Sequence, residues 1–168
     1  MSTTLVDHNE SPLISRAGYE RLRAEIARLC NSRPEMVDRL REARDDGSLA
    51  DNPALYEALE EQAQLEQRIA HLEGQLAAAR IVQPKGDGTV GVGNSVRLRD
   101  LGTNEVVEYE LVGGIEASAG NGRVSIAAPV GQALLGAGTG EVVNVATPRG
   151  RVQLEVLEVR ATSVRKAA

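Results

Sequence analysis

The fold of this chain is decided by one short stretch, Asp45-Asp46-Gly47-Ser48-Leu49-Ala50-Asp51-Asn52-Pro53. Glycine readily adopts the left-handed conformation that ends a helix, so Gly47 predicts the end of a preceding helix. Asparagine followed by proline is typical of a helix start, with Asn52 as the N-cap and Pro53 at the first helical position. The stretch therefore predicts a short connection between two helices.

The residues before this connection predict a long, interrupted helix. Ser15 has the side chain of an N-cap, and apolar residues follow it at helical spacing. Pro34 removes a backbone donor and clashes with the preceding turn, so we expect the helix to kink or restart there. The predicted apolar stripe consists of Leu22, Ile26, Leu29, Val37 and Leu40.

The residues after the connection predict a second helix with a heptad seam. Its positions are spaced 4-3-4-3-4, and one of them is polar. They are Ala58, Gln62, Leu65, Ile69, Leu72 and Leu76. Two such helices joined by a short turn form an antiparallel hairpin. Each arm of about 28–30 residues would extend about 40–45 Å at the rise of an α-helix.

The second half of the chain has a different composition. From Pro84 onward glycine recurs among valine and leucine, which predicts short strands separated by turns. Val96 and Leu98 alternate with polar residues, and a turn at 148–150 joins the last two predicted strands. The expected strands are 106–112, 123–127, 141–146 and 152–159, with a short helix at 128–136.

These patterns predict an α+β protein, an antiparallel coiled-coil hairpin followed by a small, mostly antiparallel β domain. The breaker residues of 83–88 indicate a linker. The predicted organisation is a flexible arm at 1–12, the hairpin at 13–82 with its acidic tip at 45–52, the linker at 83–88, the globular domain at 89–160 and a tail at 161–168.

Composition excludes several classes of function. Aromatic residues make up 2% of the chain and are Tyr19, Tyr56 and Tyr109, so an aromatic-lined ligand pocket is not expected. A net charge of −5 argues against independent nucleic-acid binding. One cysteine, Cys30, allows neither an internal disulfide nor a zinc cluster. No apolar run is long enough for a membrane span, and we expect a cytoplasmic protein.

The predicted turn lies within an unusual run of acidic residues. Seven acids and no lysine or arginine occur between Asp45 and Gln67. Such a run is often only a solvated helix face. However, Asp45 and Asp46 lie at the C-terminal end of a helix, where the helix dipole disfavours negative charge. This departure from the stability rule favours a functional role for the tip.

Three parts of the sequence together resemble the Gre transcript-cleavage factors, GreA and GreB. The tip segments are Arg33-Pro34-Glu35, Glu42-Ala43-Arg44 and Gly47-Ser48-Leu49-Ala50-Asp51-Asn52, with Tyr56 following. The opening pattern Leu13-Ile14-Ser15 with Gly18-Tyr19 and the later pattern Ala128-Pro129 with Ala133-Leu134-Leu135-Gly136 also resemble the family. The resemblance covers residues 13–160.

The resemblance implies a coiled coil joined to an FKBP-like domain. It implies that the partner is RNA polymerase, with the coiled coil in the secondary channel. In the family, two tip acids help to hold a Mg²⁺ of the polymerase active centre, so the factor lends ligands and is neither an enzyme nor a holder of its own cofactor. The surface around Pro129, Leu134 and Leu135 is the implied candidate for docking on the polymerase.

This chain departs from the family pattern at its tip. The two acid positions fall at Ser48 and Asp51, and serine is a much weaker Mg²⁺ ligand than a carboxylate. One additional residue separates Asn52 from Tyr56, and Glu60 stands where the family often has a basic residue near the RNA. Arg44 retains the other basic position. These differences predict a channel-occupying inhibitor or modulator of the polymerase.

The alternatives are a working cleavage factor, an isomerase and a scaffold. A cleavage factor requires Asp45 or Asp46 to replace the missing acid. An FKBP-type isomerase or chaperone requires aromatic pocket walls, and Tyr109 is the one aromatic residue beyond residue 82. A dimeric coiled-coil scaffold requires a free seam, whereas the hairpin uses its own seam internally, so we expect a monomer.

Overall fold

The computed structural model of the chain describes residues 11–45 and 52–162. These residues form two compact units. The helical unit is Glu20–Ala77, and the globular unit combines the segment up to Tyr19 with the segment from Ala78 onward.

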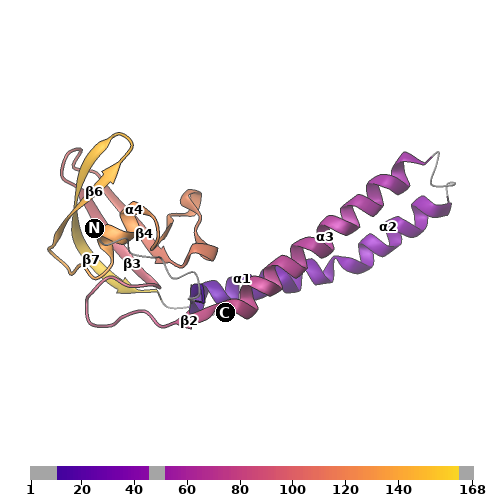
Figure 1. Cartoon of the computed structure of the whole chain (residues 1–168), viewed down its shortest axis with the longest axis horizontal. Helices are drawn as coiled ribbons and strands as arrows, with labels where there is room; N and C mark the ends of the chain where they lie inside the picture. The colour runs from indigo at the N-terminus through magenta and orange to yellow at the C-terminus, as the bar shows by residue number, and fades with distance from the viewer. Residues whose placement is uncertain (1–10, 46–51, 163–168) are drawn as a thin grey trace, which may run out of the picture. The chain divides into compact units, whose positions relative to one another are not determined.

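The helical unit is the predicted hairpin (Figure 1). Helix α1 spans Arg16–Asn31, α2 spans Arg33–Asp45 and α3 spans Pro53–Ala78. The interruption expected at Pro34 is present between α1 and α2. There the Ser32 hydroxyl donates a hydrogen bond of 2.7 Å to the carbonyl of Leu29.

The restart of the helix changes which residues face the partner helix. Leu40 and Ala43 are buried, whereas Val37 is 43% exposed. The prediction that Val37 continues the apolar stripe is therefore wrong. Because α2 begins anew at Arg33, its inward face follows Met36, Leu40 and Ala43, at i, i+4 and i+7.

The seam of α3 is buried at Ala58, Ile69 and Leu72 and only partly covered at its other positions, including its last residue, Leu76. Leu55 of α3 is buried as well. The intervening Gln62 and Leu65 are only partly covered. Ion pairs between the two arms lie near this stretch, linking Arg33 to Glu66 at 2.7 Å and Arg39 to Glu61 at 3.2 Å. Arg68 likewise reaches Glu25 across the hairpin, at 3.0 Å.

The globular unit is built on a five-stranded sheet with the strand order β5-β4-β3-β7-β6. One pair, β4 with β5, is parallel and the others are antiparallel, as predicted. The strands are β3 (Asn94–Asp100), β4 (Val106–Val112), β5 (Arg123–Ser125), β6 (Val142–Thr147) and β7 (Gly150–Ala161). The short helix α4 spans Pro129–Leu134, and two 3-10 turns span Gly114–Glu116 (η2) and Ala119–Asn121 (η3).

The core of the globular unit is aliphatic. Val96 and Leu98 of β3 are fully buried, as their alternation predicted. α4 packs beside β6 and contributes Leu134. The buried cluster consists of Val90, Val96, Leu98, Leu111, Leu134, Ala137, Val145, Leu154 and Val156.

A two-stranded parallel sheet was not expected. It pairs β1 (Leu13–Ser15) with β2 (Arg80–Val82), with Ile14 opposite Ile81. The sequence prediction assigned 13–82 entirely to the hairpin, whereas these two ends of that range are strands of the globular unit. Strands of three residues are too short to show an alternating pattern, so periodicity could not reveal them.

The buried carboxylate of Glu116 holds the strand β1 and the start of α1. It accepts hydrogen bonds from the Ser15 amide at 2.7 Å and the Ser15 hydroxyl at 2.6 Å. The same hydroxyl accepts a bond of 2.9 Å from the amide of Gly18, which confirms Ser15 as the N-cap. A Cβ atom at Gly18 would overlap the Glu116 carboxylate, so this contact requires glycine.

Candidate functional site at the distal end of the hairpin

The sequence placed the functional residues at the turn between α2 and α3. Of these, Arg44 and Asp45 are exposed at the end of α2, and Glu60 is exposed on α3. The other predicted tip residues, Asp46, Ser48 and Asp51, lie outside the described residues.

Asn52 links the end of α2 to the start of α3. Its Nδ2 donates a hydrogen bond of 2.6 Å to the carbonyl of Ala43, near the end of α2. Its Oδ1 accepts a bond of 3.1 Å from the amide of Leu55, which confirms the predicted N-cap of α3. The side chain is 8% exposed, so both bonds are shielded from water. One amide group therefore fixes where α2 ends relative to where α3 begins.

An apolar cluster supports this junction. Leu40 and Ala43 of α2 pack against Leu55 and Ala58 of α3, with Leu59 partly buried beside them. Side chains in such a cluster have few alternative rotamers. Arg44 and Asp45 directly follow Ala43 in the chain, so the exposed groups at this end project from a packed base.

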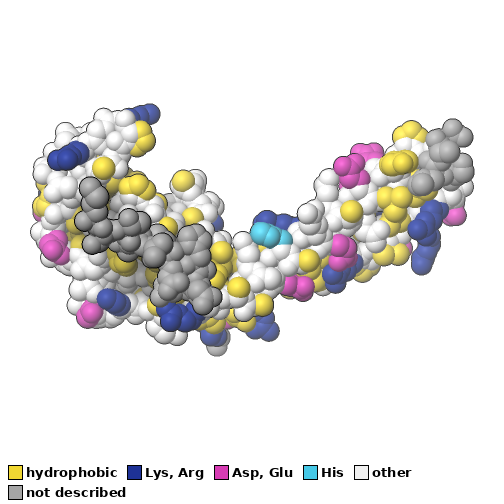
Figure 2. Space-filling view, in the orientation of Figure 1, with side chains coloured by type: hydrophobic (Ala, Val, Ile, Leu, Met, Phe, Trp, Pro, Cys, Tyr) yellow, Lys and Arg dark blue, Asp and Glu magenta, His cyan; other side chains and the backbone are white. Residues whose placement is uncertain are grey.

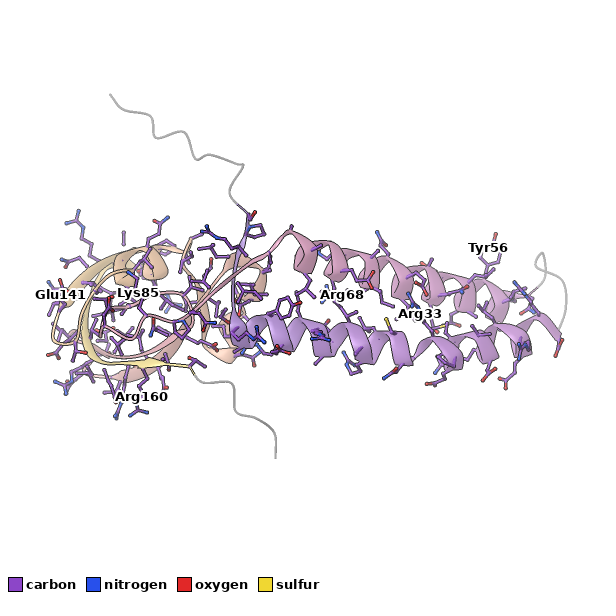
Figure 3. All side chains as sticks on the ribbon, turned by 90° about the horizontal axis from the view of Figure 1, so that it is seen from below. Arg33, Tyr56, Arg68, Lys85, Glu141 and Arg160 are labelled. Carbon is purple, nitrogen blue, oxygen red and sulfur yellow. The ribbon has the colours of Figure 1, made fainter. Side chains whose placement is uncertain are left out.

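Tyr56 lies on the outer side of α3 at this end. Its side chain is 64% exposed and points away from α2 (Figure 3). The sequence resemblance includes Tyr56 but implies no role for its side chain. Glu60 follows Tyr56 by four residues, so the two share one face of the helix.

A shallow groove runs along the other side of the same junction. It is lined by three alanines and four charged residues, which are Ala43, Ala54, Ala58, Arg39, Glu42, Glu57 and Glu61. Arg39 is already engaged, because it contacts Glu61 at 3.2 Å and Glu35 at 3.1 Å. In Figure 2, acidic and basic groups alternate along this unit, and apolar atoms reach the surface near its distal end.

The described residues near this end provide few donors for a metal ion. Within 11–45 and 52–162, no group of three or more His, Cys, Asp or Glu residues is placed to hold one. Asp45 is the one acid of the predicted tip that the structure describes, and Ser48 and Asp51 are the two positions at which the sequence resemblance implies acids. Mg²⁺ prefers several hard oxygen ligands, and a serine hydroxyl cannot offset its charge.

One ion pair of the helical unit has a clear electrostatic effect. Arg33 donates two hydrogen bonds to Glu66, of 2.8 and 2.7 Å. These bonds lower the pKa of the Glu66 carboxyl and raise the pKa of the Arg33 guanidinium. Such fork-like geometry favours the charged form of both groups.

The docking candidates of the globular unit differ in accessibility. Leu134 is fully buried and belongs to the core, so its side chain is not available to a partner. Leu135, the next residue, is 50% exposed, and Pro129 is exposed at the start of α4. The prediction failed for Leu134 because one face of α4 packs on the sheet. A short apolar run does not show which face that is.

Sequence reasoning missed two polar residues that organise the structure. Glu116 is 6% exposed and binds Ser15, which is 101 residues away in the chain. Asn94 is fully buried, donates to the carbonyls of Lys85 and Arg160, and accepts from the amide of Gly91. Gly18 was the one available signal for the first of these, because its missing side chain makes room for a neighbour.

Comparison with known proteins decides the family. The family described as transcription elongation factor, N-terminal, matches residues 12–81, and the family described as transcription elongation factor, GreA/GreB, C-term, matches residues 83–161. This chain belongs to the GreA/GreB family. The two matches meet at residue 82, where the sequence changes composition, and they confirm the resemblance drawn from the tip and flanking motifs.

Individual relatives align with nearly the whole chain. Transcription elongation factor GreA of Chlorobaculum parvum is 39% identical over 87% of this chain and 94% of its own length. GreA of Clostridioides difficile is 39% identical over 92% of this chain and 99% of its own. GreA factor homolog 1 of Thermus thermophilus, a crystal structure, is 31% identical over 88% of this chain and 97% of that chain, with a TM-score of 0.40.

In the described part of this GreA/GreB family member, no helix is long and apolar enough to cross a membrane.

Proposed function

We propose that this GreA/GreB family member binds RNA polymerase, places its helical hairpin in the secondary channel and inhibits or modulates transcription without stimulating RNA cleavage. The observation that carries the proposal is Ser48. It occupies one of the two tip positions where the family resemblance implies an acid.

The chemistry of the tip supports an inhibitor. Stimulation of phosphodiester hydrolysis requires groups that hold a metal ion and orient water. A serine hydroxyl is neutral and binds Mg²⁺ weakly, so Asp51 remains as one acid where the family has two. Glu60 adds negative charge at a position that the resemblance places near RNA phosphates, which would repel the transcript.

The geometry of the hairpin supports a rigid occupant of a channel. Asn52 ties α2 to α3 through the two bonds of 2.6 and 3.1 Å, and the apolar cluster packs directly below. A hairpin whose end is held by packing and hydrogen bonds can block the entry of nucleotides into the channel without changing its own conformation. The same rigidity would keep the exposed Asp45 at the end of α2 from moving freely towards a metal ion.

The second candidate function is a working cleavage factor. Asp45 favours it, because this exposed carboxylate lies at a helix C-terminus where the dipole opposes negative charge. In that case Asp45 or Asp46 would supply the second acid, and Asp51 would supply the first. An isomerase is not favoured, because Tyr109, the one aromatic residue beyond residue 82, packs against the core cluster of the globular unit.

The test uses a stalled, backtracked elongation complex with end-labelled RNA. The protein is added at several Mg²⁺ concentrations, and RNA cleavage and nucleotide addition are followed together. We expect cleavage to remain at background while nucleotide addition slows. Cleavage above background that is abolished by Asp51→Asn or Asp46→Asn would establish the cleavage factor instead.

A restored acid makes the test sharper. Ser48→Asp returns the second carboxylate and is expected to raise cleavage above background, whereas Ser48→Asn, of the same size and without charge, is expected to leave it unchanged. Equal behaviour of the two variants would show that the missing acid does not explain the activity. Complete absence of a complex with RNA polymerase would contradict the proposal as a whole.

A further inference from the structure

Tyr56 and Glu60 are neighbouring exposed side chains on the outer face of α3. Side chains four residues apart on a helix have Cβ atoms about 5–6 Å from each other. Tyr56 is 64% exposed, an unusual position for a large ring in a chain that has three aromatic residues. Glu60 is exposed beside it. A phenol ring and a carboxylate thus face solvent together.

Neither side chain has a partner in the parts of the chain that the structure describes. The Tyr56 hydroxyl and the Glu60 carboxylate take part in no hydrogen bond or ion pair there, although the Tyr56 amide continues the helix. Neighbouring acids on α3 differ in this respect. Glu61 is held by Arg39 and Glu66 by Arg33. Within residues 11–45 and 52–162 the pair therefore has no partner, whereas the acids next to it are already engaged.

We propose that Tyr56 and Glu60 together bind one arginine side chain of the protein that surrounds the hairpin. This inference rests on the proposed function, in which that protein is RNA polymerase. A planar guanidinium can lie on the face of the tyrosine ring and donate two hydrogen bonds to the carboxylate. Lysine, a compact point charge, cannot make both contacts in the same way.

The local charge favours a cationic protein group over nucleic acid. Between Pro53 and Gln67, α3 carries Glu57, Glu60, Glu61 and Glu66 and no lysine or arginine. A nucleotide could stack its base on Tyr56, but its phosphates would approach this acidic helix face at an electrostatic cost. A guanidinium gains from both the ring and the surrounding carboxylates.

The experiment measures the affinity of the full chain for RNA polymerase core enzyme, free of nucleic acid, at several salt concentrations. We expect Tyr56→Leu to weaken binding about 2- to 30-fold, the range of a cation–π contact from exposed to desolvated. Glu60→Gln should also weaken binding, because it removes the charge that strengthens the hydrogen bonds to the guanidinium. Tyr56→Phe keeps the ring and is expected to bind like the unaltered chain. Glu60→Arg is expected to weaken binding most, because like charges then meet.

Two further measurements test the shared arginine. The double variant Tyr56→Leu with Glu60→Gln should lose less than the product of the two single effects, because both residues contact one side chain. The matched control Glu73→Gln removes another exposed acid of α3, 13 residues away or about 20 Å along the helix. It is expected to leave the affinity unchanged.

Several outcomes would overturn the inference. Unchanged binding by Tyr56→Leu or Glu60→Gln would do so while leaving the proposed function intact, as would strictly multiplicative effects. Tighter binding by Glu60→Arg would overturn the inference by showing that the polymerase groups facing this surface are acidic. An effect of Tyr56→Leu seen only when RNA is present would assign the surface to nucleic acid. Failure of the unaltered chain to bind the polymerase would overturn both proposals.

Discussion

The two units of this protein are stabilised in different ways. The globular unit has a continuous aliphatic core in which Val96, Leu98 and Leu111 are fully buried. The helical unit has a seam that is only partly buried, at Gln62, Leu65 and Leu76, and exposed ion pairs lie beside its central part. Exposed pairs contribute little to stability. The stability of the globular unit therefore comes mainly from its buried core, whereas much of the hairpin remains exposed for contact with a partner.

The largest expected effect is on the free energy of unfolding, and it distinguishes the sheet core of the globular unit from the partly exposed seam of the hairpin. Leu98→Ala removes a fully buried side chain from the sheet core and is expected to lower the free energy of unfolding by about 3–4 kcal/mol. Leu65→Ala, in the half-exposed part of the seam, is expected to cost about 1–2 kcal/mol. Chemical denaturation followed by circular dichroism measures both. Equal losses would contradict the contrast between the units.

Two glycine-to-alanine substitutions compare a tightly packed position in the globular unit with an open position in the hairpin. Gly113→Ala places a Cβ atom against the backbone carbonyl of Leu13, which cannot move aside as a side chain can, and should destabilise the globular unit by about 2–3 kcal/mol. Gly74→Ala is the matched control in α3, where nothing lies within 4 Å. It should stabilise the hairpin by about 0.5–1 kcal/mol, since alanine favours helix. Thermal unfolding would reveal the opposite signs.

Asn52 tests how the distal end of the hairpin is held. Asn52→Ala removes the N-cap of α3 and the bond to the Ala43 carbonyl, and is expected to cost about 1–2 kcal/mol. Asn52→Asp keeps the acceptor for the Leu55 amide and loses the donor, so its loss should be smaller. Amide hydrogen exchange at Leu55 would report the change locally. Unaltered exchange in Asn52→Ala would show that packing alone holds this end.

The smallest effect concerns the exposed pair Arg33–Glu66. Because this pair holds the pKa of Glu66 below its ordinary value in the folded state, its stabilising contribution is present above the ordinary pKa and is lost as the pH falls through the lowered one. In Arg33→Gln the Glu66 pKa should return towards its ordinary value. An NMR titration of the side-chain carboxyl at low and high salt measures this. A pKa unchanged by Arg33→Gln would assign the shift to another cause.

Local sequence chemistry was sufficient for much of the fold. The helix starts at Ser15 and Asn52 depend on side chains that bond to amides three residues later, so they can be read from short stretches. Pro34 likewise predicts the interruption between α1 and α2 locally, because proline removes a backbone donor and clashes with the preceding turn. The strands β3 and β4 and the β6–β7 hairpin followed from alternation and turn residues.

The candidate site was only partly accessible from sequence. The acidic run and Ser48 are visible in the chain itself, and they motivate the proposed function. The bond from Asn52 to Ala43 and the outward direction of Tyr56 are not, because they depend on how α2 and α3 pack. Leu134 and Val37 were misassigned because helical spacing identifies a stripe but does not fix which side of it meets the neighbouring element.

The sequence by itself determined the helical hairpin, the mostly antiparallel sheet and the family, since periodicity, caps and motifs are properties of neighbouring residues. The tertiary structure alone decided that β1 pairs with β2 and that Glu116 binds Ser15 across 101 residues. A buried carboxylate needs hydrogen-bond donors, but many arrangements of the chain could supply them. Only the folded packing selects the donors that are close enough to bind.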